Sequence, residues 1–112
     1  MTDRLASHML IGALIRGADR LGGSAVVLRK GDGISGSILI QCLEKGRNCG
    51  LFERVPDYAK GGYTLAPCGP GMDSDEAETT AYLDRRMRAD PDLWLIELNV
   101  PDAQRFAAET IC

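Results

Sequence analysis

Histidine and aromatic residues are scarce in this chain. One histidine, one tryptophan, three tyrosines and two phenylalanines occur among 112 residues. Any triad or dyad that uses imidazole as its base must therefore use His8. An excess of basic residues is missing as well, because the formal net charge is −3. Nucleic-acid binding needs clustered lysine and arginine to neutralise phosphates, so the composition disfavours a nucleic-acid partner.

Long hydrophobic runs are also missing. The longest run near the start, Met9 to Ile15, covers about a third of the ~20 residues that a membrane-spanning helix needs. Asp3 stands where a signal peptide would carry basic residues. We therefore expect a cytoplasmic protein that has no membrane partner.

The cysteines form no Cys-x-x-Cys pair. In the cytosol, Cys42, Cys49, Cys68 and Cys112 are expected to be reduced thiols. Cys42, Cys49 and Cys68 could meet His8 in a tetrahedral zinc site, but their spacing in the sequence does not indicate one. We therefore predict no metal and no cofactor. Cys42 is predicted to be a small buried apolar residue, whereas Cys49 and Cys112 are the candidate reactive thiols.

Length and apolar periodicity predict one domain over residues 1–112. The expected elements are a helix capped by Thr2 or Asp3 and ended by Gly22-Gly23, strands over 24–30, 37–44, 51–55 and 63–66, a second helix capped by Asp73 or Ser74 and running to Ala89, a strand over 93–98, and a helix over 101–111. The fold class is α+β, with a mostly antiparallel sheet of about five strands covered by two or three helices in the order α-β-β-β-β-α-β-α. Short connections between the first four strands favour an antiparallel meander.

The strand Leu93-Trp94-Leu95-Ile96-Glu97-Leu98 is predicted to lie inside the sheet. Five of its six residues are apolar, which indicates burial on both faces. Glu97 is its one carboxylate. A buried carboxylate must find a partner or take up a proton, so Glu97 is either half of a structural ion pair or a weak candidate for a general acid or base.

A glycine loop, Gly31-x-Gly33-x-x-Gly36, matches the dinucleotide-binding pattern. That function requires the loop to open a helix whose amide groups hold a pyrophosphate, whereas the residues after Gly36 predict a strand. A kinase loop does lie between strands, but the catalytic-loop and metal-binding motifs are missing. We therefore interpret the glycines as turn residues with positive φ.

Basic residues are most concentrated near the end of the second helix. Acidic residues begin this helix and arginines end it, which complements the helix macrodipole and favours a structural role. The alternative is an anion-binding site formed by Arg16, Lys30, Arg85, Arg86 and Arg88. If the protein is an enzyme with this anion site, His8 or Glu97 would be its proton-transfer group. That alternative requires all these groups to line one pocket.

Several segments together resemble a small bacterial family. They are Arg4-Leu5-Ala6-Ser7, Ala13-Leu14-Ile15-Arg16, Lys30-Gly31-Asp32, Gly50-Leu51-Phe52-Glu53-Arg54, Asp90-Pro91-Asp92-Leu93-Trp94 and Arg105-Phe106-Ala107-Ala108-Glu109-Thr110. The sequence is similar in these segments to DUF1491, a domain of unknown function. The resemblance implies single-domain cytosolic proteins of this size, and it supplies no catalytic residues.

The sequence favours a small non-catalytic binding or adaptor protein over an enzyme. Its partner would be an unknown protein or a second copy in a homodimer. We expect the contact surface at Leu51-Phe52, at the loop from Tyr58 to Tyr63, or at an exposed edge of the sheet. The alternative is a small enzyme or ligand-binding protein that uses the anion site described above.

Overall fold

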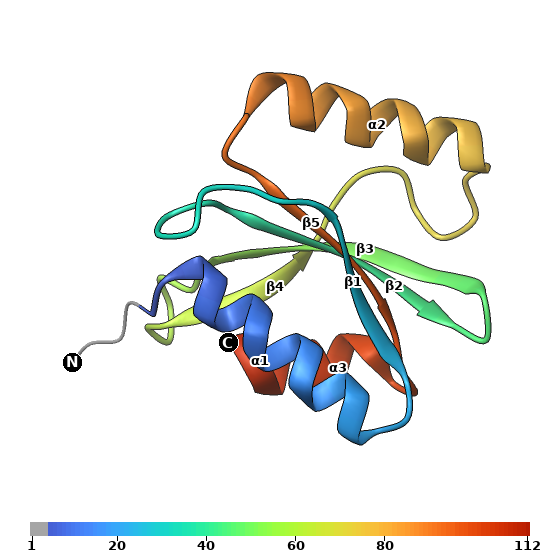
Figure 1. Ribbon diagram of the computed structural model, residues 1–112. Coiled ribbons are helices and arrows are strands. Elements are labelled where there is room, and N and C mark those ends of the chain that lie inside the picture. The colour runs from blue at the N-terminus through green and yellow to red at the C-terminus, as the bar shows by residue number, and fades with distance from the viewer. Residues whose placement is uncertain (1–4) are drawn as a thin grey trace.

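The computed structural model describes residues 5–112 and has the predicted element order (Figure 1). Its elements are α1 (Ser7–Arg20), β1 (Ser24–Arg29), β2 (Ile38–Glu44), β3 (Arg47–Pro56), β4 (Tyr63–Pro67), α2 (Glu76–Ala89), β5 (Trp94–Asn99) and α3 (Ala103–Ile111). The α+β class and the five-stranded, mostly antiparallel sheet are thereby confirmed.

The strands form one sheet in the order β1-β5-β2-β3-β4. β5 pairs antiparallel with β1 and parallel with β2, and the remaining pairs are antiparallel. The expected meander therefore holds only for β2, β3 and β4, because β5 enters between β1 and β2. This central position, with strands on both edges and helices over both faces (Figure 1), explains the apolar run of β5, where Trp94 is 4% exposed and Ile96 and Leu98 are 0% exposed.

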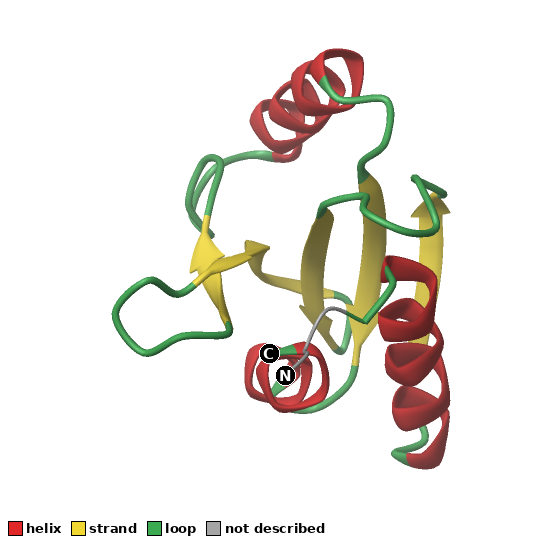
Figure 2. Ribbon diagram, turned by 90° about the vertical axis from the view of Figure 1, so that its left-hand side faces the viewer, coloured by secondary structure: helices red, strands yellow, loops and turns green. Residues whose placement is uncertain are grey.

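Helices cover both faces of the sheet (Figures 1 and 2). α1 and α3 lie on one face, and α2 lies on the other. Successive side chains of β5 point to alternate faces of the sheet, as strand geometry requires. Trp94, Ile96 and Leu98 belong to the larger apolar cluster with α1 and α3, whereas Leu95 packs with Leu83 of α2.

The predicted starts of all three helices differ from the structure, and α3 begins at Ala103 rather than at residue 101. Thr2 and Asp3 lie outside the described residues, and α1 begins at Ser7 after the N-cap Ala6, which makes no side-chain capping bond. α2 is capped by Asp75, which forms a capping box with Glu78. The predicted caps Asp73 and Ser74 are therefore wrong, because the same three-residue spacing of Asp and Glu recurs two positions later.

β3 is longer than predicted and begins at Arg47. The sequence predicts strands that end at residue 44 and begin again at residue 51, but only Lys45-Gly46 separate β2 from β3. Both residues have positive φ, 52° and 79°, as a two-residue hairpin turn of type I′ requires. Within residues 5–112, no helix combines the length and apolar character that crossing a bilayer demands.

Candidate functional site

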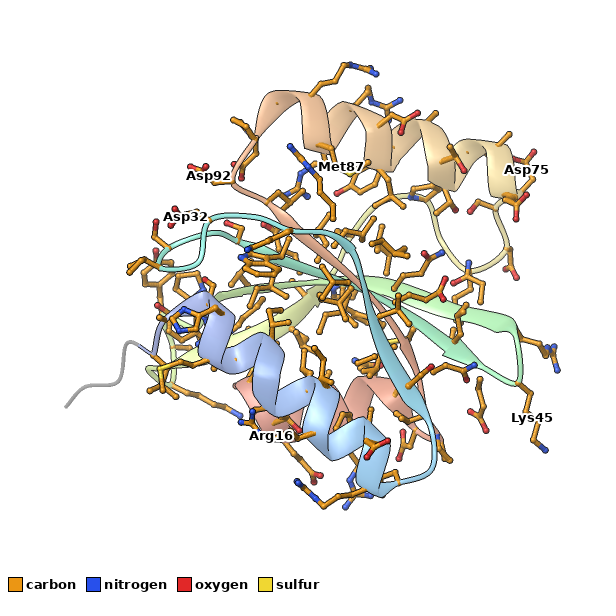
Figure 3. The ribbon with its side chains drawn as sticks, viewed as in Figure 1. Arg16, Asp32, Lys45, Asp75, Met87 and Asp92 are labelled. Atoms are coloured by element: carbon orange, nitrogen blue, oxygen red, sulfur yellow. The ribbon has the colours of Figure 1, made fainter. Side chains whose placement is uncertain are left out.

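The glycine loop folds around the backbone carbonyl of Asp92, and Figure 3 shows Asp32 and Asp92 at the same end of the molecule. The amide of Asp32 donates to the Asp92 carbonyl oxygen at 3.0 Å. A Cβ atom on Gly31 or on Gly36 would lie 2.2 Å from the same oxygen. Neither glycine has positive φ, so the interpretation as positive-φ turn residues is wrong. Glycine is required at these two positions because two backbone segments pack against each other.

The loop is also bonded to the buried strand β5. The indole Nε1 of Trp94 donates to the carbonyl oxygen of Asp32 at 2.8 Å, and the amide of Gly36 donates to the same oxygen at 3.2 Å. Gly33 differs, because a Cβ there would meet only His8, at 3.6 Å. Residues after Gly36 enter β2, so the loop opens no helix that could hold a pyrophosphate.

The carboxylate of Asp32 organises the turn itself. Its Oδ2 accepts hydrogen bonds from the amides of Ile34 and Ser35 at 3.1 and 2.8 Å, and from the Ser35 hydroxyl at 3.2 Å. The amide of Ser35, then that of Ile34, then the Ser35 hydroxyl lower the pKa of Asp32 below its ordinary value of 3.8. Hydrogen bonds to the ionised form act in this direction.

We expect this carboxylate to make stability depend on pH in acid. Because the pKa of Asp32 is lower in the folded chain, its ionised form stabilises the fold above pH 3.8, and this contribution is lost as the pH falls through the folded-state pKa. Urea unfolding of wild type and Asp32→Asn should therefore differ by a constant amount at higher pH, and the difference should shrink below pH 3.8. A difference that stays constant throughout would show that Asp32 has an ordinary pKa.

The start of α1 is bonded to the same loop. Amides of Ser7 and His8 donate to the carbonyl oxygens of Ile34 and Gly33 at 3.1 and 2.9 Å, and the Ser7 hydroxyl donates to Gly36 at 2.7 Å. The Nδ1 of His8 lies 2.8 Å from the Gly33 oxygen and must carry a proton to donate there. The imidazole of His8 is exposed on this surface, and its catalytic role stays a prediction.

The five basic residues of the predicted anion site do not meet in one place. Arg16 lies on α1, whereas Arg85, Arg86 and Arg88 lie on α2, across the sheet (Figure 3). Lys30 is exposed just after β1. A ligand-binding role for any of them singly stays a prediction.

Arg86 has partners of its own. It donates to the Glu53 carboxylate at 2.9 Å and to the Tyr82 hydroxyl at 2.7 Å. The hydrogen bond that it donates to Glu53 is the largest of the effects that raise the pKa of Arg86 above its already high value. These contacts fasten α2 to β3.

Arg29 has a structural role that no pattern in the sequence indicates. It donates to the carbonyl oxygens of Met87, Asp90 and Pro91 at 3.0, 3.3 and 3.3 Å. A cation at the last carbonyls of a helix also interacts favourably with the macrodipole. Arg29 thereby fixes the end of α2 to the edge strand β1.

Glu97 points to the α2 side of the sheet rather than into the larger core. It is half-buried and lines a cleft of about 490 Å³ together with Leu28 of β1 and Leu83 of α2. Its carboxylate forms no hydrogen bond or ion pair with any residue in 5–112 that would make it half of a structural pair. The acid–base role suggested for Glu97 stays a prediction.

The four cysteines are free thiols in different surroundings. Cys42 is 0% exposed, as predicted, and burial raises its pKa to about 12. Burial also raises the pKa of Cys68, which lowers its fraction of nucleophilic thiolate. Cys49 is half-buried and Cys112 is exposed, and the reactivity suggested for these two thiols stays a prediction. In residues 5–112, no three His, Cys, Asp or Glu side chains are grouped so that they could hold a metal ion.

The sequence and the fold both match known relatives. The family model described as "Protein of unknown function (DUF1491)" matches residues 5–108. A DUF1491 family protein from Caulobacter crescentus has a similar crystal structure, with 30% identity, a TM-score of 0.76, and coverage of 91% of this chain and 94% of that one.

Two solution structures are similar as well. Protein Atu0922 from A. tumefaciens is 29% identical, with a TM-score of 0.67 and coverage of 88% of this chain and 87% of that one. An NMR structure of a DUF1491 family protein from Caulobacter crescentus is 30% identical, with a TM-score of 0.70 and coverage of 87% and 86%. No curated protein matches the chain. As the resemblance predicted, the chain belongs to the DUF1491 family of proteins of unknown function.

Proposed function

We propose that this protein is a small non-catalytic binding protein whose contact surface is the free edge of β1. The observation that carries the proposal is a row of three apolar residues on that strand. Val26, Val27 and Leu28 are 45, 37 and 49% exposed. β1 ends the strand order, so only one of its edges is paired. An unpaired apolar strand edge is a template for pairing with another strand.

Two of the other surfaces considered from the sequence, Leu51-Phe52 and the β4 edge, are less suitable, whereas the loop from Tyr58 to Tyr63 stays a prediction. Leu51 and Phe52 are only 5 and 7% exposed, so they belong to the core. The opposite edge of the sheet, β4, ends in Pro67, which has no amide proton to donate. β1 contains no proline, although a register shift between Val27 and Arg29 limits regular pairing to its first part.

The occupant that we propose for this edge is β1 of a second copy. Antiparallel pairing of two identical strands is symmetric and produces a closed dimer. The segment from Ser24 to Leu28 carries no charged side chain, so the two copies would bring no like charges opposite each other. The cytoplasmic location and any other protein partner stay predictions.

Light scattering on the purified chain tests this proposal. We expect the mass of two chains for wild type, and the mass of one chain for Val26→Lys, because two lysines would then face each other across the symmetric pair. Ile15→Lys is the matched control, since Ile15 is 40% exposed on α1. It should stay dimeric. A wild type that keeps the mass of one chain at high concentration would overturn the proposal, as would equal dissociation of both variants.

A further inference from the structure

A cavity of about 390 Å³ lies at the end of the molecule where α1 begins. Its lining comes from the start of α1, from residues 34–38 and from the hairpin of β3 and β4. Leu5 and Ile34 belong to this lining and remain 57 and 72% exposed. The volume lies within the range of small-molecule sites. The cavity is separate from the β1 edge.

Arg54 is the one charged residue among the described residues that line this cavity. Its Nε donates to the carbonyl oxygen of Ile111, the last residue of α3, at 2.6 Å. Its guanidinium carbon lies 3.6 Å from the ring centroid of Tyr63. The two contacts fix the guanidinium plane, but they use one of its five N–H donors. Arginine held in this way is preorganised for bidentate binding of an anion.

The surroundings of Arg54 favour negative charge in a ligand. No Asp or Glu belongs to the described lining, although the protein as a whole is acidic. The first turn of α1 contains no acidic residue, and its N-cap supplies no side-chain acceptor. The described residues at the start of α1 therefore place no carboxylate against an anion bound at Arg54. Ser37 contributes a hydroxyl to the same lining.

We infer that this cavity binds a small organic carboxylate with an apolar body. The planar fork of Arg54 matches the two oxygens of a carboxylate. The ring of Tyr63 and the side chains of Leu5 and Ile34 cover the apolar part. The described lining supplies one arginine, which balances one negative charge, so a monoanion fits better than a doubly charged phosphate. The inference uses a different arginine from the five predicted and does not depend on dimer formation.

The test is an NMR titration of the ¹⁵N-labelled full chain with sodium benzoate, with benzyl alcohol and inorganic phosphate as parallel arms. Benzoate should cause saturable shifts confined to Ser7, residues 34–38, Tyr63 and the Arg54 side chain. Benzyl alcohol, which has the same ring without the charge, should bind about tenfold more weakly, as the loss of a charge-assisted bond predicts. Phosphate should bind more weakly than benzoate.

Two variants separate binding from folding. Arg54→Lys keeps the charge but loses the fork, and Ile34→Ser changes an exposed side chain at the cavity. Both should weaken benzoate binding, by about fivefold or more for Arg54→Lys. Arg47→Gln, on the same strand but outside the cavity, should leave binding unchanged. The inference fails if benzoate gives no saturable shifts, if benzyl alcohol binds equally well, or if Ile34→Ser and Arg54→Lys bind benzoate like wild type.

Discussion

Replacing Gly36 with alanine should destabilise the protein by about 3 kcal/mol, which is the upper part of the range for overpacking. The new Cβ would lie 2.2 Å from the Asp92 carbonyl oxygen and 2.8 Å from that of Asp32. Both atoms are backbone, so no flexible side chain can move away. Relief would require the loop to separate from the residues before β5, with loss of the hydrogen bond between Asp32 and Asp92.

Gly33→Ala in the same motif is the matched control. Its Cβ would make only an ordinary contact with His8, at 3.6 Å. We expect its free energy of unfolding to stay within about 0.5 kcal/mol of wild type. Urea unfolding followed by circular dichroism measures both variants. Equal effects at Gly33 and Gly36 would contradict the close-packing explanation.

Truncation of Trp94 to alanine should cost about 3–5 kcal/mol, because a buried aromatic side chain is replaced by a cavity. Trp94 is 4% exposed and packs in the cluster that joins the sheet to α1 and α3. Trp94→Phe should cost less, because it keeps most of the packing. The stability that Trp94→Phe loses includes the contribution of the indole hydrogen bond to Asp32, which is worth about 1 kcal/mol.

The control for Trp94 is Tyr58→Ala, at a residue that is 93% exposed. This substitution should change the free energy of unfolding by less than about 0.5 kcal/mol. Unfolding should be followed by circular dichroism rather than by tryptophan fluorescence, because Trp94→Ala removes the one tryptophan of the chain. A Trp94→Ala variant as stable as Tyr58→Ala would show that β5 is not the centre of the core.

The sequence predicts those features of the fold that local patterns determine. The apolar run from Leu93 to Leu98 identified a central strand, since only cover on both faces allows such a run. Proline and glycine placed the end of α2 after Ala89 and that of α1 before Gly22. The parallel pairing of β5 with β2 was missed, because the register joins Trp94 to Ile38, far away in the chain, and no local pattern encodes it.

The candidate site was less predictable for the same reason. Arg54 and Arg29 make their hydrogen bonds with residues 57 and 58 positions away, so nothing near them in the sequence indicates their partners. The glycine spacing was visible, but its cause was not. Glycine is favoured both at positive-φ turn positions and where two backbone segments pack closely. Only the position of Asp92 in the structure shows which reason applies here.

Hydrogen exchange measured by NMR tests most directly whether the glycine loop is a rigid part of the fold. The protons to follow are the Trp94 indole N–H and the amides of Asp32 and Gly36, with the amide of Tyr58 as an exposed reference. All three should exchange only through opening of the core, far more slowly than Tyr58. Exchange as fast as that of Tyr58 would contradict the structural role of the loop and would leave its glycines free to serve a ligand.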